Sequence, residues 1–220
     1  MRATFGIIAA VCVFGGGIEN VAADDGEPPV GKLIGAGVAM ALPTYWLGVT
    51  AHEGSHALAG KLLGGKVTRF SIIPGRYGAR KTFYFGYVSV SGLRTTKQRS
   101  LFWLAPKMTD LILLGGYSAL TLTGNLPHNR YGALALTVLA TGLVIDFGKD
   151  VISMRRGNDV VKTYNANGLT GELGRLPFRL THAALTIAAS YVVYRGYRDV
   201  FEDRSDPSMT AFIPLWTGTL

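Results

Sequence analysis

The amino-acid sequence predicts an all-α polytopic membrane protein with about four transmembrane helices and a small β-rich insertion after the first helix. Three observations support this fold class. The 220 residues are 48% hydrophobic and only 16% charged, whereas about 25% of residues are charged in soluble domains. Glycine occurs 29 times without a collagen period, as in closely packed membrane helices. Long apolar stretches alternate with short polar segments, which suits repeated crossing of a bilayer.

The first 32 residues are expected to precede the folded domain. Residues 1–23 are typical of a signal peptide, with one basic residue, an apolar core and a small-residue cleavage site before Asp24. An uncleaved anchor helix is the alternative interpretation. Residues 24–32 form an acidic, proline-containing lead-in that we expect to be exposed. The single cysteine, Cys12, excludes a disulfide framework and a cysteine-type zinc site.

Residues 33–198 form the predicted membrane-embedded domain. Its first helix begins with 19 uncharged residues, enough to cross a bilayer. The four predicted spans are 33–63, 101–124, 131–153 and 178–194. The polar segments between and after them are a short turn at 125–130, a loop at 155–177 and a partly acidic tail at 199–220.

Residues 66–100 differ in character from the predicted helices. They are rich in β-branched and aromatic residues, and Pro74-Gly75 marks a turn, so we expect two or three strands. The segment holds eight basic residues and no acidic residue. This bias is typical of a cytoplasmic loop that follows the positive-inside rule. Contact with anionic lipid or nucleic acid is the alternative. The acidic lead-in and tail then lie on the outer side, which four spans satisfy.

A His-Glu-x-x-His sequence lies at the end of the first apolar run. His52 and His56 are four residues apart, which places them on one side of a helix, where both can bind a single Zn²⁺. Glu53 lies beside them and can take a proton from water at the metal. Packed or solvated helix histidines with an incidental glutamate are the alternative. We favour the zinc site, because charged groups beside an uncharged membrane run are costly unless they have a function.

A catalytic zinc site normally has a third protein ligand, and depth in the bilayer selects the candidates. His52 lies 19 residues from the outer start of its helix, or about 28 Å. Asp146 lies 15 residues from the outer start of the third span, or about 22 Å. Both depths fall in the inner half of a bilayer core of about 30 Å. Asp146 is therefore the predicted third ligand, and pairing with Lys149 or an arginine is the alternative.

Four other titratable residues receive weaker assignments. Asp150, at a depth of about 28 Å, and Asp110, about 14 Å from the inner start of the second span, are less favoured ligands. A structural role is favoured for both, in the case of Asp110 by pairing with Lys107 three residues earlier. His182 is expected to be packed or hydrogen-bonded in its helix. His128 lies in the outer turn and has no motif around it.

Four stretches carry a resemblance to one known family, namely 52–59, 85–88, 105–110 and 146–148. They resemble, in that order, the His-Glu-x-x-His helix, the membrane-associated sheet, the Gly-Pro…Asn stretch and the Asp-Gly motif of the site-2 protease family of intramembrane zinc metalloproteases. The resemblance covers roughly residues 33–153. In the last motif, Phe147 separates the aspartate from the glycine. In the family, that aspartate supplies the third zinc ligand.

The motif and the resemblance together imply a zinc endopeptidase that hydrolyses membrane-embedded or membrane-proximal peptide bonds. Glu53 is then the general base, and His52, His56 and Asp146 bind Zn²⁺. The expected partners are a membrane protein or peptide substrate and the lipid bilayer, without nucleic acid, and the expected location is a bacterial inner membrane. Two alternatives stay open. One is a non-catalytic membrane protein with a vestigial motif, whose basic segment binds lipid or a partner. The other is a zinc-dependent hydrolase of a different bond.

Overall fold

A computed structural model describes residues 28–78, 81–152 and 158–202; the predicted signal peptide and most of the tail lie outside these ranges. The described part contains five helices and four short strands. In chain order they are α1 (Val30–Leu62), β1 (Lys66–Ser71), β2 (Gly75–Tyr77), β3 (Thr82–Tyr84), β4 (Tyr87–Ser91), α2 (Thr96–Leu122), α3 (Arg130–Ile152), α4 (Asp159–Ala166) and α5 (Glu172–Phe201). The mostly helical fold with a β insertion after the first helix is therefore confirmed.

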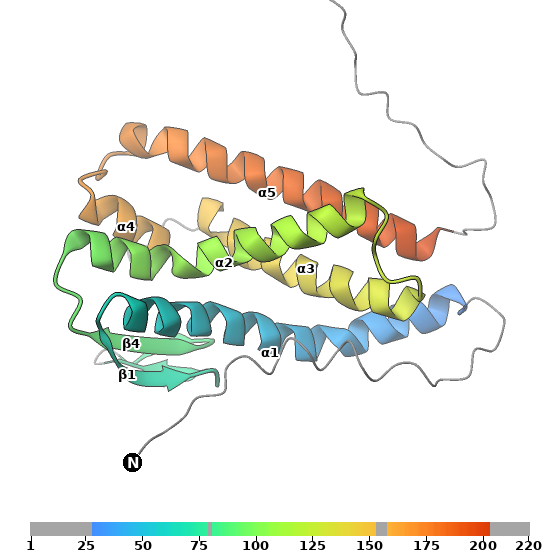
Figure 1. The fold of residues 1–220 in the computed structure, drawn as a ribbon, viewed down its shortest axis with the longest axis horizontal. Coiled ribbons are helices and arrows are strands. Elements are labelled where there is room, and N and C mark those ends of the chain that lie inside the picture. Colours follow the sequence, from blue (N-terminus) through green and yellow to red (C-terminus); the bar gives the residue numbers. More distant parts are fainter. Residues whose placement is uncertain (1–27, 79–80, 153–157, 203–220) are drawn as a thin grey trace, which may run out of the picture.

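The four long helices lie side by side and alternate in direction, and the short helix α4 lies at the end of the bundle where α1 and α3 finish (Figure 1). Helix α3 packs against α1, α2 and α5. Its buried face includes Ala133, Thr137 and Ala140, and such small side chains let neighbouring helices approach closely. Because α1 and α3 run in the same direction, the residues near their C-terminal ends come to the same level of the bundle.

The β insertion lies along the C-terminal half of α1 (Figure 1). Strand β1 pairs antiparallel with β4, and β2 pairs antiparallel with β3, so the predicted two or three strands are four. A Cβ atom at Gly60 would lie 2.7 Å from a methyl carbon of Val90. Glycine at this position of α1 therefore allows β4 to pack directly on the helix.

The predicted loop at 155–177 is wrong in two respects. Residues 159–166 form the helix α4, and α5 begins at Glu172 instead of at residue 178. The side-chain oxygen of Asn158 accepts hydrogen bonds from the backbone N–H groups of Val160 and Val161, which caps α4. The apolar side chains of α4 are buried against the bundle. This burial outweighs the polar composition from which the loop was predicted.

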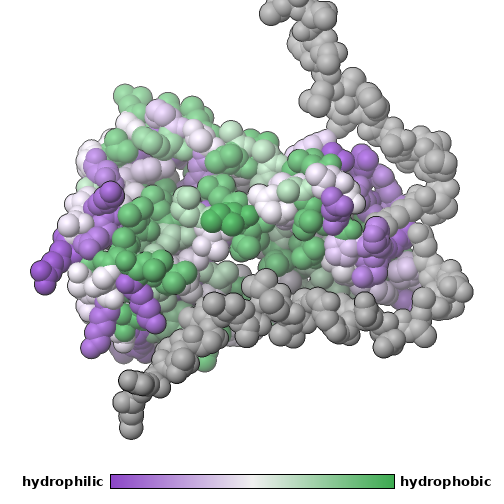
Figure 2. Space-filling model, viewed as in Figure 1, coloured by the Kyte–Doolittle hydropathy of each residue, from purple (hydrophilic) through white to green (hydrophobic). Residues whose placement is uncertain are grey.

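Two of the described helices, α1 and α3, are long and apolar enough to cross a membrane. In the N-terminal half of α1, Leu33 is buried in the core, but Ile34, Val38 and Leu42 face outward, with Val38 72% exposed. Hydrophobic residues cover the middle of the face drawn in Figure 2, and hydrophilic residues gather toward its two ends. The other two predicted spans, α2 and α5, contain more charged residues, so length and composition support two spans instead of four.

Candidate metal centre

The two histidines of the sequence motif lie on one side of α1, as helical spacing predicts. Their ring centroids are 5.2 Å apart, and His56 is buried. The neighbouring elements reach this part of α1 from three directions: α2 and α3 from within the bundle and α4 from its end. The two imidazoles therefore occupy the junction of four helices.

Each histidine is held through its Nδ1 atom. The Nδ1 of His52 donates to Oδ2 of Asp146 on α3 over 2.8 Å. The Nδ1 of His56 lies 2.8 Å from the backbone carbonyl oxygen of Phe102 on α2, and it must be the donor because a carbonyl oxygen only accepts. In a neutral ring, Nε2 is then the nitrogen with a free lone pair. This is the tautomer of a metal-binding histidine whose other nitrogen is fixed by the protein.

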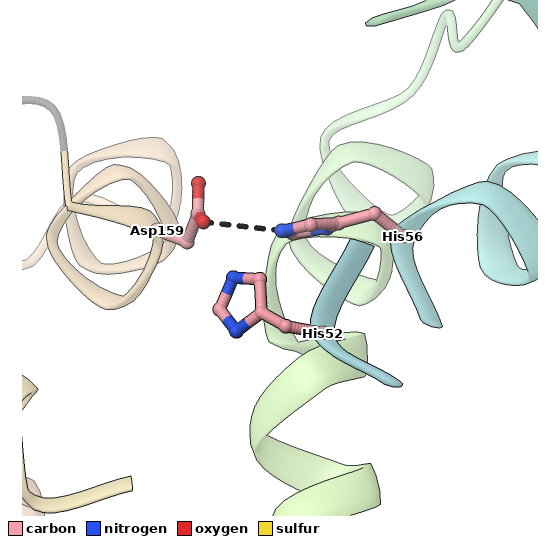
Figure 3. A group of neighbouring side chains, drawn as sticks. All are labelled: His52, His56 and Asp159. Carbon is pink, nitrogen blue, oxygen red and sulfur yellow. Dashed lines mark hydrogen bonds and ion pairs between the residues drawn. The ribbon is translucent and has the colours of Figure 1, made fainter. Parts of the chain in front are cut away.

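Asp159 completes a group of three possible ligands. His52, His56 and Asp159 each offer one ligand atom, and these atoms lie within 4.8 Å of one another. Figure 3 shows the three side chains turned toward one another. The distance from His56 Nε2 to Asp159 Oδ2 is 3.2 Å. Ligands about 2.0–2.1 Å from a tetrahedral zinc ion lie about 3.3 Å apart, so this spacing fits an edge of such a tetrahedron.

The electrostatics of this pair also fit a cation. The Nε2 lone pair of a neutral His56 would face a carboxylate oxygen, and two acceptors in contact repel each other. Either a proton on Nε2, which makes His56 a cation and a donor to the carboxylate, or a metal ion between the two atoms makes the contact favourable. Burial raises the pKa of Asp159, but the hydrogen bond and charge of His56, together with Lys162, outweigh burial and hold this pKa well below the usual carboxyl range. Asp159 is thus an ionised donor in the first turn of α4, where the helix dipole also favours negative charge.

Glu53 lies next to this group but is not part of it. Its side chain is 9% exposed, and no described residue donates a hydrogen bond to its carboxylate. The turn between β3 and β4 covers it: a Cβ atom at Gly86 would lie 2.6 Å from Cγ of Glu53 and 2.9 Å from a methyl carbon of Val49. Glycine at position 86 therefore lets the turn approach the carboxylate, which keeps acceptor capacity for a substrate or water.

Asp146, the predicted third ligand, is not part of the group formed by His52, His56 and Asp159. Its Oδ2 accepts from His52 Nδ1, and its Oδ1 pairs with Lys149, the alternative that the sequence left open. The expected match in depth with His52 is present, but the contact is a hydrogen bond to the ring nitrogen opposite the metal side. Asp146 is therefore placed to orient a ligand.

The remaining sequence candidates lie outside the group of three. Asp150 and Asp110 are both buried, and their carboxylates lie 3.0 and 3.5 Å from the ammonium nitrogen of Lys107. His182 donates from Nε2 to the backbone carbonyl of Phe147 over 2.8 Å, which confirms it as a hydrogen-bonded helix histidine.

Asp159 was not among the ligands predicted from the sequence, because it lies in the predicted loop at 155–177 and all the predicted ligands lie in the spans. A local signal was present. Asn158 is a preferred N-cap residue, and apolar residues follow at positions 160, 161 and 164, which is the spacing of one helix face. That pattern predicts a short helix with Asp159 in its first turn.

Comparison with known proteins gave no match: no family model, no curated protein and no solved structure is similar to this chain. Function is therefore inferred from the arrangement of the residues. Two imidazole nitrogens and one carboxylate oxygen lie within 4.8 Å of one another. Beside them lies the carboxylate of Glu53, to which no described residue donates a hydrogen bond. Three ligands with an open fourth position and an adjacent base are the components of metal-assisted hydrolysis.

Proposed function

We propose that this protein is an intramembrane zinc metalloprotease, which hydrolyses peptide bonds of membrane-embedded or membrane-proximal substrates. The observation that carries the proposal is the convergence of His52, His56 and Asp159, each within 4.8 Å of the others, beside Glu53. In this proposal the ligands are Nε2 of both histidines and one oxygen of Asp159. Asp146 fixes the tautomer of His52 from the opposite side.

The bound zinc ion would polarise the scissile carbonyl and acidify a water molecule. The chain's own contribution is proton transfer and orientation. Glu53 accepts a proton as the water oxygen attacks the carbonyl carbon. It then gives that proton to the amide nitrogen as the C–N bond breaks, which leaves a carboxyl group and an amine. The carboxylate of Glu53 is suited to this role because no described side chain competes for it.

The charged residues of α2 and α5 are compatible with four spans. In α2, Lys107 and its carboxylate partners pair inside the bundle, so their charges do not face lipid. In α5, charged residues lie near both ends, and residues 180–194 are uncharged. We therefore propose that α1, α2, α3 and α5 all cross the bilayer, with α4 and the metal centre near the side of the β insertion.

The substitution Glu53→Gln tests the reaction. The purified protein should contain about one zinc ion per chain and cleave a helical membrane peptide. The Glu53→Gln variant should keep the zinc and lose cleavage, because an amide cannot accept the proton. The matched control is Glu202→Gln, a partly exposed glutamate that pairs with Arg198 at the other end of the bundle, and this variant should cleave at the wild-type rate. Cleavage by Glu53→Gln near that rate, or a wild-type protein without stoichiometric zinc, would overturn the proposal.

A further inference from the structure

Lys107 lies among three carboxyl groups, of which the sequence predicts only the one on the same helix. It lies on α2, and its side chain is only 6% exposed. The sequence suggests pairing with Asp110 on the same helix, but Oδ2 of Asp110 is 3.5 Å from Nζ of Lys107. The ammonium group lies closer to two carboxylates of α3, at 3.0 Å from Asp150 and 3.3 Å from Asp146, and it also donates to the backbone carbonyl of Asp146.

One oxygen atom links this ammonium group to the candidate metal centre. Oδ2 of Asp146 lies 3.3 Å from Nζ of Lys107 and accepts from Nδ1 of His52 over 2.8 Å. The other oxygen of Asp146 pairs with Lys149, whose side chain is 49% exposed. Lys107 is thus the buried partner of the oxygen that holds the histidine. Its second bond, to the backbone carbonyl of the same residue, fixes the main chain from which the carboxylate extends.

We propose that Lys107 is a positioning residue for the metal centre, acting on His52 through Asp146. The ammonium group holds the carboxylate in the one orientation that accepts from Nδ1 of His52, and this turns Nε2 toward His56 and Asp159. The inference rests on the proposed zinc site. It gives α2 a second role in the site: this helix holds His56 through the carbonyl of Phe102 and, through Lys107 and Asp146, sets the ring orientation of His52.

A lysine suits this task for a physical reason. Carboxylates buried beside one another repel, and a buried carboxylate without a counter-charge is costly. An ammonium group has three donors, and Lys107 directs them to groups on two helices. Without the ammonium group, Asp146 keeps Lys149 as its cationic partner, but that side chain is exposed and holds the carboxylate less firmly. Asp146 can then rotate away from Asp110 and Asp150, and His52 loses its fixed orientation.

The experiment compares zinc affinity in Lys107→Met and in Lys149→Met, which removes the exposed partner of the same carboxylate. Zinc is titrated into the metal-free protein in detergent against a chromophoric chelator, and the visible absorption of the Co²⁺-loaded protein is recorded. We expect Lys107→Met to raise the zinc Kd about 10–100-fold and to change the Co²⁺ spectrum. Lys149→Met should change the Kd about threefold or less, because exposed ion pairs contribute little.

A second comparison covers the case in which Lys107→Met does not fold. The double variant Lys107→Met/Asp110→Leu removes the ammonium group together with a buried carboxyl neighbour, and it is compared with Asp110→Leu alone, so the difference isolates the lysine. A purely structural lysine would lower the melting temperature of the metal-free protein without changing zinc affinity. Wild-type zinc affinity and spectrum in the folded Lys107 variants would overturn this inference alone. A wild-type protein that binds no zinc would overturn the proposed function and this inference with it.

Discussion

Substituting Asp159 and Asp146 separately with asparagine distinguishes a zinc ligand from a residue that orients a ligand. The two carboxylates contact different histidines through different ring nitrogens. Asp159 faces Nε2 of His56 at 3.2 Å, and Asp146 accepts from Nδ1 of His52 at 2.8 Å. Both variants remove one negative charge close to the proposed metal, so a purely electrostatic effect would be similar in the two. A direct bond to the metal would make them differ.

The magnitudes follow from the two geometries. Zinc binding at four-ligand sites is worth about 10–16 kcal/mol, or about 2.5–4 kcal/mol per ligand. Loss of Asp159 as a ligand should therefore weaken zinc binding roughly 10²–10³-fold. In Asp146→Asn, the amide oxygen can still accept from His52, and only the charge is lost. Loss of an outer partner of this kind weakens metal binding about 10–100-fold. We expect Asp159→Asn to have the larger effect by about tenfold.

The assay is zinc competition with a chromophoric chelator on protein purified in detergent, at fixed pH and salt. The matched control is Asp199→Asn, a carboxylate near the C-terminal end of α5, at the far end of the bundle from α4 (Figure 1). Its zinc affinity should equal that of the wild type. Melting temperatures of the metal-free variants separate loss of a ligand from loss of the fold.

The reverse order of effects would refute the assignment. If Asp159→Asn bound zinc like the wild type and Asp146→Asn lost it, the third ligand would be Asp146, as the sequence predicts, and α4 would have only a structural role. Equal and small effects in both variants would show that neither carboxylate binds the metal.

Three further predictions concern the turn at β4, a buried histidine and the topology. The substitution Gly86→Ala should lower peptide cleavage about 10–100-fold in a kinetic assay with little change in zinc content, because the added methyl group displaces Glu53; unchanged cleavage would contradict the role given to this turn. His182→Leu should lower the free energy of unfolding by about 1 kcal/mol, because it removes the hydrogen bond that His182 donates to a backbone carbonyl of α3, and denaturation with unchanged zinc affinity would confirm this; a variant that loses zinc would contradict it. Reporter fusions at Arg94 and after Glu202 should give opposite readouts if four helices cross the bilayer, whereas matching readouts would contradict four spans.

Features that depend on neighbours along the chain can be predicted from the sequence. The spacing of His52 and His56 places them together in any helix, because residues four apart share a face. The apolar run before them predicts α1, and the uncharged run from residue 131 predicts α3. The β-branched and aromatic residues of 66–91 predict the strand insertion. None of these conclusions requires knowledge of which helices are in contact.

Helix packing selects the carboxylate that lies beside the two imidazoles. Depth along α3 correctly brought Asp146 to the level of His52, but depth does not determine which ring nitrogen a carboxylate meets. That depends on the rotation of α1 and on the carbonyl of Phe102, which fixes the second ring. Asp159 is 103 residues from His56 in the chain. It reaches the site because the apolar face of α4 is buried against the bundle, and no spacing in the sequence encodes where that burial occurs. Lys107 is a parallel case: the sequence offered a neighbour three residues away, whereas packing of α2 on α3 gave it closer partners.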